Sequence, residues 1–358
     1  MAPDPHEQLA SRLNALPDGF PRTAEGHELR LLRYLFLEPE AELAAHLRLT
    51  LETPEQIAER LERDPQALRQ MLKQMARKGL IAAGKTDQGV GYGLMPFVVG
   101  IYEMQSGRID RELAELFEAY YQAAFHEAIA MQPPVHRVVP VGESIAMNSE
   151  IRPYDSVRQI LDEARAWGVT DCICRKQKAL IGEGCDHPMD VCMVFSATPG
   201  AFDRSSTIRS LTHEEAIATL ERAAEAGLVH SVSNSQTGHW YLCNCCTCSC
   251  GILRGLAEMG VSNVVARSSY VNHVDDDLCV GCELCVGYCP FGALSCEGLA
   301  SVDAARCTGC GVCSVHCPEG ALALIPRPEA EIAPPPPDLM AWRQARAKNH
   351  GLSLEDIL

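Results

Sequence analysis

Residues 279–290 read CVGCELCVGYCP, and residues 307–318 read CTGCGVCSVHCP. Both stretches follow the spacing C-x2-C-x2-C-x3-C-P, so the chain carries one pattern twice. Three thiols at this spacing wrap a loop around an iron–sulfur core, while the fourth ligand has to come from elsewhere. Zinc ribbons use separate C-x2-C pairs rather than triple repeats, so two zinc sites do not explain the pattern.

The two stretches resemble the bacterial two-cluster ferredoxins, and the resemblance covers Tyr270 to Ile325. In that family the fourth cysteine of each run binds the other cluster. The resemblance therefore implies one [4Fe–4S] cluster held by Cys279, Cys282, Cys285 and Cys317, and a second held by Cys307, Cys310, Cys313 and Cys289. It implies one-electron transfer at low potential, with no iron open to a substrate.

Several neighbours of these ligands have expected roles. Gly281 and Gly309 should let the backbone approach the sulfides. Pro290 and Pro318 should turn the chain after each crossing ligand. Cys296 lies between the runs without a motif role and is expected to be a spare, buried thiol, and His316 is expected to be exposed beside Cys317.

Nine more cysteines lie upstream, in DCICRKQKALIGEGCDHPMDVCMVF (171–195) and YLCNCCTCSCG (241–251). They are Cys172, Cys174, Cys185, Cys192, Cys243, Cys245, Cys246, Cys248 and Cys250. In extended chain, residues two apart share a face, so Cys172 and Cys174 should point together, as should Cys243 and Cys245. The nine could fill two four-ligand sites with one left over, or one site with accessory thiols.

Three interpretations of these nine thiols remain open: one or two further iron–sulfur clusters, structural zinc, or bare redox thiols. Arg175 could steady thiolate charge beside Cys174. His187 and His239 lie close to these cysteines in the sequence and could bind the metal in place of a thiol. A lone histidine beside a metal-binding loop is more often a neighbour of the ligands than a ligand itself.

The order CxCR, GxxCxxPxxxCxxF and CNCCxCxCG ahead of the double motif resembles a group of multi-domain 4Fe–4S proteins of anaerobic metabolism. The resemblance spans Val157 to Ile325 and implies additional iron–sulfur binding. Ser249 interrupts the run of cysteines found in that group, so a ligand role is not carried over to this position.

The first 171 residues hold no cysteine. Within 28–100, three helical patterns precede a glycine-rich turn, AAGKTDQGVGYG. Thr53-Pro54 and Asp64-Pro65 are helix starts, and Gly79 marks a helix end. Helices followed by a hairpin resemble a winged-helix domain.

The third of these helices carries four cations, Arg69, Lys73, Arg77 and Lys78. Such cations could contact DNA phosphates, and a redox-sensing regulator is therefore one hypothesis. The acids around them favour a solvated face on a domain that docks to protein.

The fold class expected is α+β with several domains: a winged-helix-like domain, a cysteine-rich α/β middle domain and a two-cluster ferredoxin-like domain. A short N-terminal segment comes first. An amphipathic connector helix (Ile109 to Met131) is expected between the first two domains, and helices are expected within the middle domain at Ser156–Trp167 and Thr212–Ala226. The expected segments are 1–27, 28–100, 101–139, 140–268, 269–326 and a proline-rich linker with a C-terminal helix at 327–358.

Composition limits the function. A net charge of −16 disfavours general affinity for nucleic acid or anionic membranes. The start MAPDPHEQLA lacks a signal-peptide pattern and no long apolar run is seen, so a cytoplasmic protein without membrane insertion is expected. In that compartment eighteen cysteines argue for metal rather than disulfides.

No catalytic motif is recognised, so a carrier is favoured over a stand-alone enzyme. The leading hypothesis is an iron–sulfur electron-transfer protein that passes single electrons to or from a partner oxidoreductase. The alternatives are the DNA-binding regulator and an oxidoreductase whose middle cluster has an open site.

Overall fold

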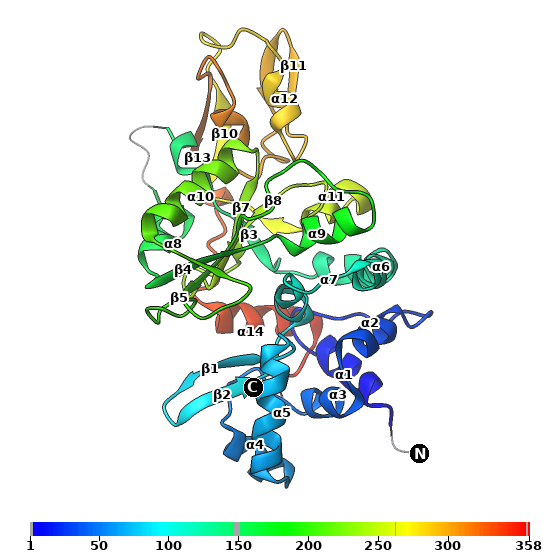
Figure 1. Cartoon of the computed structure of the whole chain (residues 1–358). Helices are drawn as coiled ribbons and strands as arrows, with labels where there is room; N and C mark the ends of the chain where they lie inside the picture. Colours follow the sequence, from blue (N-terminus) through cyan, green and yellow to red (C-terminus); the bar gives the residue numbers. More distant parts are fainter. Residues whose placement is uncertain (1–2, 147–150, 262, 356) are drawn as a thin grey trace. The chain divides into compact units, whose positions relative to one another are not determined.

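The computed structural model (Figure 1) describes residues 3–146, 151–261, 263–355 and 357–358. The chain forms two compact units. The first comprises Met1–Met131, Lys176–Glu183 and Arg343–Leu358, and the second comprises Gln132–Arg175 and Gly184–Trp342. The cysteine-rich middle segment and the double-motif segment therefore share the second unit.

The first unit is mostly helical. Its elements before the hairpin are α1 (Pro5–Asn14), α2 (His27–Leu35), α3 (Glu38–Ala45), α4 (Pro54–Leu61) and α5 (Pro65–Arg77). Thr53 and Asp64 cap α4 and α5 by accepting hydrogen bonds from backbone amides, as their sequence positions predict. The hairpin of β1 (Ala82–Thr86) and β2 (Gly89–Gly93) follows. The sequence analysis had not identified α1 or α3.

Beyond the hairpin, the expected connector helix is found in three consecutive pieces: α6 (Arg111–Tyr120), η3 (Tyr121–Phe125) and α7 (His126–Ala130). They follow two short turns, η1 (Phe97–Ile101) and η2 (Glu103–Gln105). The aromatic side chains of the connector are buried, and Phe117 stacks on Tyr102 with 3.8 Å between ring centroids. They form part of the core of the first unit.

The C-terminal helix α14 (Leu339–His350) packs on its own chain. In the first unit, Arg346 is fully buried and donates hydrogen bonds to the carbonyls of Pro17, Ala128 and Met131. A guanidinium with three carbonyl acceptors holds this tail in place.

The second unit is built on a seven-stranded sheet with the order β6-β4-β5-β8-β7-β3-β9. Its strands are β3 (His136–Val138), β4 (Ala166–Thr170), β5 (Cys192–Ser196), β6 (Arg209–Leu211), β7 (Val229–Ser233), β8 (Tyr241–Cys245) and β9 (Val265–Ala266). All pairs are antiparallel except β3–β9. Apolar residues of the sheet pack against helices α8 (Val157–Asp162) and α10 (His213–Glu225), as in Figure 1. Short turns η4 (Gly142–Ser144) and η5 (Pro153–Asp155) precede α8.

One local expectation for this unit was wrong. The helix expected at Ser156–Trp167 ends at Asp162, and Trp167 lies in β4 between β5 and β6. The aromatic and β-branched residues of AWGVT fit a half-buried strand better than a helix end. Cys172 and Cys174 do lie together, as expected, although Cys174 is in the first turn of α9 (Ile173–Leu180) and not in extended chain.

The double-motif segment consists of two small two-stranded sheets and two short helices. Strand β10 (Tyr270–Val274) pairs with β13 (Leu322–Pro326), and β11 (Leu294–Glu297) pairs with β12 (Leu299–Val302). The helices are α12 (Leu284–Tyr288) and α13 (Val312–Val315), and η6 (Glu329–Glu331) follows the segment. Backbone hydrogen bonds from Val141 to Cys310 and from Ala146 to Leu324 attach the segment to the middle domain. Among the described residues, no helix is both long and apolar enough to cross a membrane.

Candidate metal centres

Two cavities divide the eight motif cysteines. The first cavity is lined by Cys279, Cys282, Cys285 and Cys317, together with the extra thiol Cys296. The second is lined by Cys289, Cys307, Cys310 and Cys313. Each cavity therefore takes three thiols from one run and the fourth from the other run. Four thiols around one enclosed space fit the ligand requirement of a [4Fe–4S] cluster.

The glycine two residues after the first cysteine of each run has a left-handed backbone. Gly281 has φ +66° and Gly309 has φ +71°. A Cβ on Gly309 would collide with the carbonyl of Tyr270 and the hydroxyl of Ser268. Both position and conformation therefore require glycine here.

The second cavity is the more buried of the two. Cys307, Cys310 and Cys313 are buried, whereas Cys282 of the first cavity is exposed. Burial raises the pKa of Cys310 to about 12 and also raises that of Cys313. These thiols would stay protonated at neutral pH without a cation, because a buried thiolate alone is costly.

Hydrogen bonds to sulfur also differ between the cavities. In the second, Asn272 donates from its backbone to Cys307 Sγ at 3.5 Å and from Nδ2 to Cys313 Sγ at 2.8 Å. Ala293 N donates to Cys289 Sγ at 3.2 Å. In the first cavity, Ala300 N donates to Cys279 Sγ at 3.4 Å. Asn272 lies on β10, outside the motif, and nothing in the sequence marked it.

The nine upstream cysteines separate into two groups. Six of them form a closed ring in which each thiol lies close enough to two neighbours to shift their pKa values, in the order Cys172, Cys174, Cys250, Cys245, Cys243, Cys192. We call this set the six-thiol pocket. Hydrogen bonds from Cys243 and Cys250 lower the pKa of Cys245 to about 6.

Strand pairing builds the six-thiol pocket. Met193 of β5 lies opposite Leu242 of β8, which brings the neighbouring Cys192 and Cys243 together. Cys172 comes from the segment before α9, where its backbone N–H bonds the carbonyl of Met189. The pairing of β5 with β8 is a long-range contact, so the sequence could not group these cysteines.

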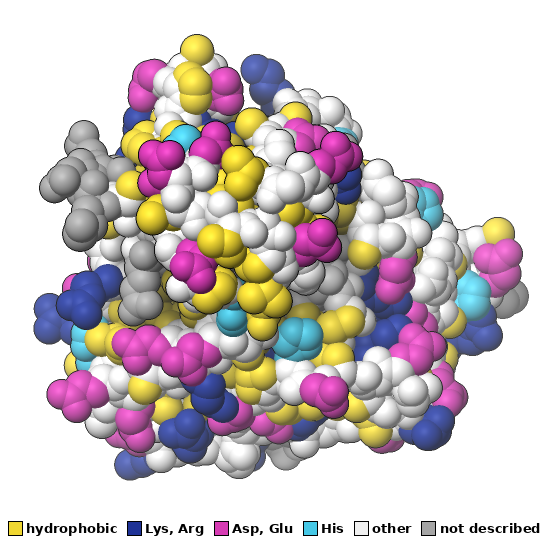
Figure 2. Space-filling view, turned by 90° about the horizontal axis from the view of Figure 1, so that it is seen from above, with side chains coloured by type: hydrophobic (Ala, Val, Ile, Leu, Met, Phe, Trp, Pro, Cys, Tyr) yellow, Lys and Arg dark blue, Asp and Glu magenta, His cyan; other side chains and the backbone are white. Residues whose placement is uncertain are grey.

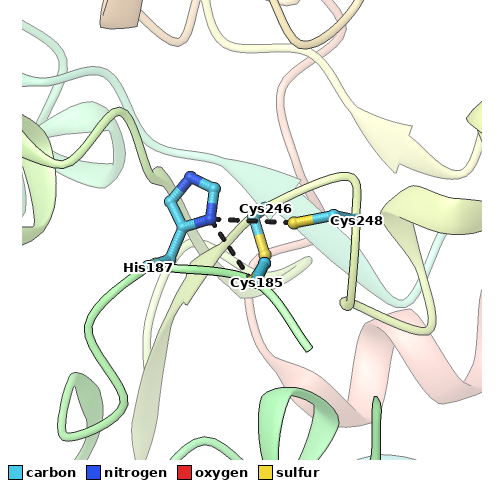
Figure 3. Close-up of side chains that lie close together, drawn as sticks. All are labelled: Cys185, His187, Cys246 and Cys248. Carbon is cyan, nitrogen blue, oxygen red and sulfur yellow. Dashed lines mark hydrogen bonds between the residues drawn. The ribbon is translucent and has the colours of Figure 1, made fainter. Parts of the chain in front are cut away.

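The other three upstream cysteines lie around His187 (Figure 3). The ligand atoms of Cys185, His187, Cys246 and Cys248 all lie within 4.8 Å of one another. His187 Nδ1 is 3.4 Å from Cys185 Sγ and 3.7 Å from Cys248 Sγ. Burial would raise the pKa of Cys185, but hydrogen bonds with Ser249 and His187 lower it to about 6.

Arg175 lies between the two groups. Its side chain is 1% exposed, and it donates to the carbonyl of Asn244 and, from Nη1 at 3.6 Å, to Cys246 Sγ. Burial acts to lower its pKa, but the thiolates of Cys172, Cys246 and Cys192 raise it above the usual value. A buried guanidinium is costly without compensation, and here it lies beside sulfur atoms of both groups and supplies them with positive charge.

The two other histidines singled out from the sequence, His239 and His316, lie outside the group around His187. His239 Nδ1 lies 3.1 Å from Ser233 Oγ. His316 is half-buried and stacks on Tyr288 with 3.8 Å between ring centroids, rather than being exposed. The buried Ser249 contacts Cys185 Sγ at 3.4 Å, so it lies beside a candidate ligand.

Comparison with known families supports the double motif. Residues 273–295 and residues 299–322 each match a 4Fe-4S binding domain. No curated protein matches the chain. The expected ferredoxin-like segment with iron–sulfur binding is therefore confirmed, and the domains point to a role in electron transfer.

The backbone at Gly309 offers a direct test of the second cavity. Gly309→Ala should lower iron content by about four atoms per chain, because the collision would displace the loop that carries Cys307 and Cys310. Iron and acid-labile sulfide, measured after anaerobic purification, report the loss. Gly320→Ala is the matched control, since Gly320 also has positive φ (+62°) but its Cβ would meet open space. Equal iron in both variants would contradict this role of Gly309.

Removal of the buried guanidinium tests the charge balance of the upstream groups. Arg175→Met should release metal from the middle domain at least about tenfold more readily to a chelator, because unbalanced buried thiolates are unfavourable. The iron of the double-motif segment should stay. Arg254→Met is the control, because Arg254 is as buried but bonds the carboxylate of Glu258. Equal metal retention in both variants would rule out this role of Arg175.

Proposed function

We propose that this chain is an iron–sulfur electron-transfer protein that exchanges single electrons with a partner oxidoreductase. The observation that carries the proposal is the arrangement of eight motif cysteines as two four-thiol cavities with crossed ligands. Clusters held by cysteine alone supply one-electron transfer and offer no iron position to a substrate. The protein's own part is to hold the thiolates, to bury most of one set and to bring Cys282 of the other set to the surface.

The six-thiol pocket is the proposed site of a further iron–sulfur cluster. Six thiols that face one another exceed the four ligands that such a cluster needs, and Arg175 supplies a positive charge beside them. The six-thiol pocket also lies near the double-motif segment. Gly227 lies against Tyr288 and His316, and two residues later Val229 pairs with Cys245.

The surface around Cys282 is the proposed docking face for the partner. Large apolar side chains are exposed there: Leu278, Val280, Leu284, Tyr288 and Leu299. Exposed acids surround them: Asp275, Asp276, Asp277, Glu283 and Glu297. Figure 2, which looks onto the end that carries α12 and β11, shows hydrophobic side chains with acidic ones among them. Such a face suits a partner with an apolar centre and a basic rim.

The N-terminal domain is proposed to be a winged-helix-like module that contacts protein. Support comes from the succession of α4, α5 and the β1–β2 hairpin. Two of the four cations in and directly after α5 are engaged by acids of the same unit, Arg69 by Glu55 and Lys78 by Glu40. This pairing reduces the positive charge that α5 could offer to DNA phosphates.

Cysteine replacement tests the proposed function. Cys282→Ser and Cys310→Ser should each lose about four irons, since each removes a ligand of a different cluster. The remaining iron should still show a one-electron signal by electron paramagnetic resonance after reduction with dithionite. Cys296→Ser removes a thiol of the first cavity that lies outside the motif, and it should keep the full iron content. A wild-type protein whose iron cannot be reversibly reduced would overturn the proposal.

Charge reversal tests the docking face. Asp276→Lys with Glu297→Lys should slow reduction by the methyl viologen radical cation about tenfold at low salt, because acidic charge beside the cluster attracts a cation. The rate is followed by stopped-flow absorbance. Glu163→Lys with Glu221→Lys makes the same change in net charge at exposed positions on other helices. If both double variants slow equally, overall charge rather than this face controls the encounter.

A further inference from the structure

Four side chains beside the six-thiol pocket form a compact group of their own. Cys185 and His187 come from the loop after α9, and Cys246 and Cys248 come from the turn after β8. Figure 3 shows His187 directed at both Cys185 and Cys248. The group holds three sulfur donors and one nitrogen donor, which is the ligand set of many structural zinc sites.

We propose that Cys185, His187, Cys246 and Cys248 form a closed, mononuclear zinc site that is separate from the proposed iron–sulfur pocket. This inference goes beyond the proposed function, since it assigns a different metal, a histidine ligand and a structural role. It also divides the nine upstream cysteines between two sites.

The spacing of the donor atoms supports a single ion. With Zn–S of about 2.3 Å and Zn–N of about 2.0 Å, tetrahedral geometry places nitrogen about 3.5 Å from each sulfur. His187 Nδ1 lies 3.4 and 3.7 Å from the sulfurs of Cys185 and Cys248. A four-iron cluster places an iron–sulfide core between its ligands, so it requires donors that lie farther apart.

The charge around the group also fits zinc. Three thiolates and a neutral histidine on Zn²⁺ leave one negative charge. The buried guanidinium of Arg175, which donates to Cys246 Sγ, supplies one positive charge. Ser249 Oγ contacts Cys185 Sγ, so the serine at the broken cysteine run can hydrogen-bond a ligand.

The site would join two segments that carry the six-thiol pocket. Cys246 packs with Val191, Ala223 and Leu228 in a small core, and Cys185 lies against the same core. The neighbouring Cys245 and Cys250 belong to the six-thiol pocket. Zinc bound between the two segments would fix which cysteines of the run 243–250 face each site.

The full-length protein, purified without oxygen, tests this directly. We expect about one zinc per chain, and X-ray absorption at the zinc edge should show about three sulfurs and one nitrogen. Cobalt incorporated in place of zinc should give the ligand-field bands of a tetrahedral thiolate site. Absence of zinc, or a zinc ion with four sulfur ligands, would overturn the assignment without any variant.

Variants then connect the metal to the residues. His187→Ala and Cys248→Ala should bind zinc at least tenfold more weakly and keep their iron. Cys172→Ser, in the six-thiol pocket, should keep zinc. His213→Ala is the histidine control. His213 of α10 bonds Asp162 of α8 and has no place in either cysteine group, so this variant should keep both metals. Loss of iron instead of zinc from His187→Ala would overturn the proposal.

These results are independent of the proposed electron transfer. If the protein binds zinc but its iron cannot be reduced, the zinc site is supported and the proposed electron transfer is ruled out. If its clusters are reducible but it contains no zinc, the electron transfer is supported and the zinc site is ruled out.

Discussion

A thiolate buried in protein is stable only with a positive charge beside it, and this constraint governs the second unit. Cys285 and Cys313 lie in the small core of the double-motif segment, among Leu294, Ala300 and Leu322. This core contains few apolar side chains, since two two-stranded sheets and two single-turn helices bury little surface. Metal binding therefore supplies folding free energy as well as chemistry. We infer that this segment depends on its clusters for its packing.

The same constraint makes the two motif cavities unequal. They follow one spacing, so sequence alone assigns them one chemistry. The structure buries one and hydrogen-bonds it through Asn272, while it leaves Cys282 of the other at the surface. Hydrogen bonds to sulfur and solvent exposure both alter the potential of a cluster. The two sites therefore need not share a potential, and the greater exposure of the first supports the proposal that the partner contacts it.

How much the sequence could predict depended on whether the ligands were local. Three of the four ligands proposed for each cluster of the double motif lie within about seven residues of one another, so the sequence could group them. Helix starts at Thr53, Asp64 and Thr212 followed from capping chemistry. The upstream cysteines could not be grouped, because the pairing of β5 with β8 decides which thiols meet. Trp167 was wrongly assigned to a helix, because its strand partners Phe195 and Leu211 also lie far from it in the sequence.

The alternation at Cys245 and Cys246 shows how one short run can serve two sites. Cys245 ends β8 and faces the six-thiol pocket, whereas Cys246 begins the turn and faces His187. Adjacent residues in extended chain point to opposite sides, so the two sites must be neighbours. Two neighbouring sites rich in thiolate repel each other unless a cation separates them. Arg175 lies where both sets of thiolates act on it, and its burial follows from that position.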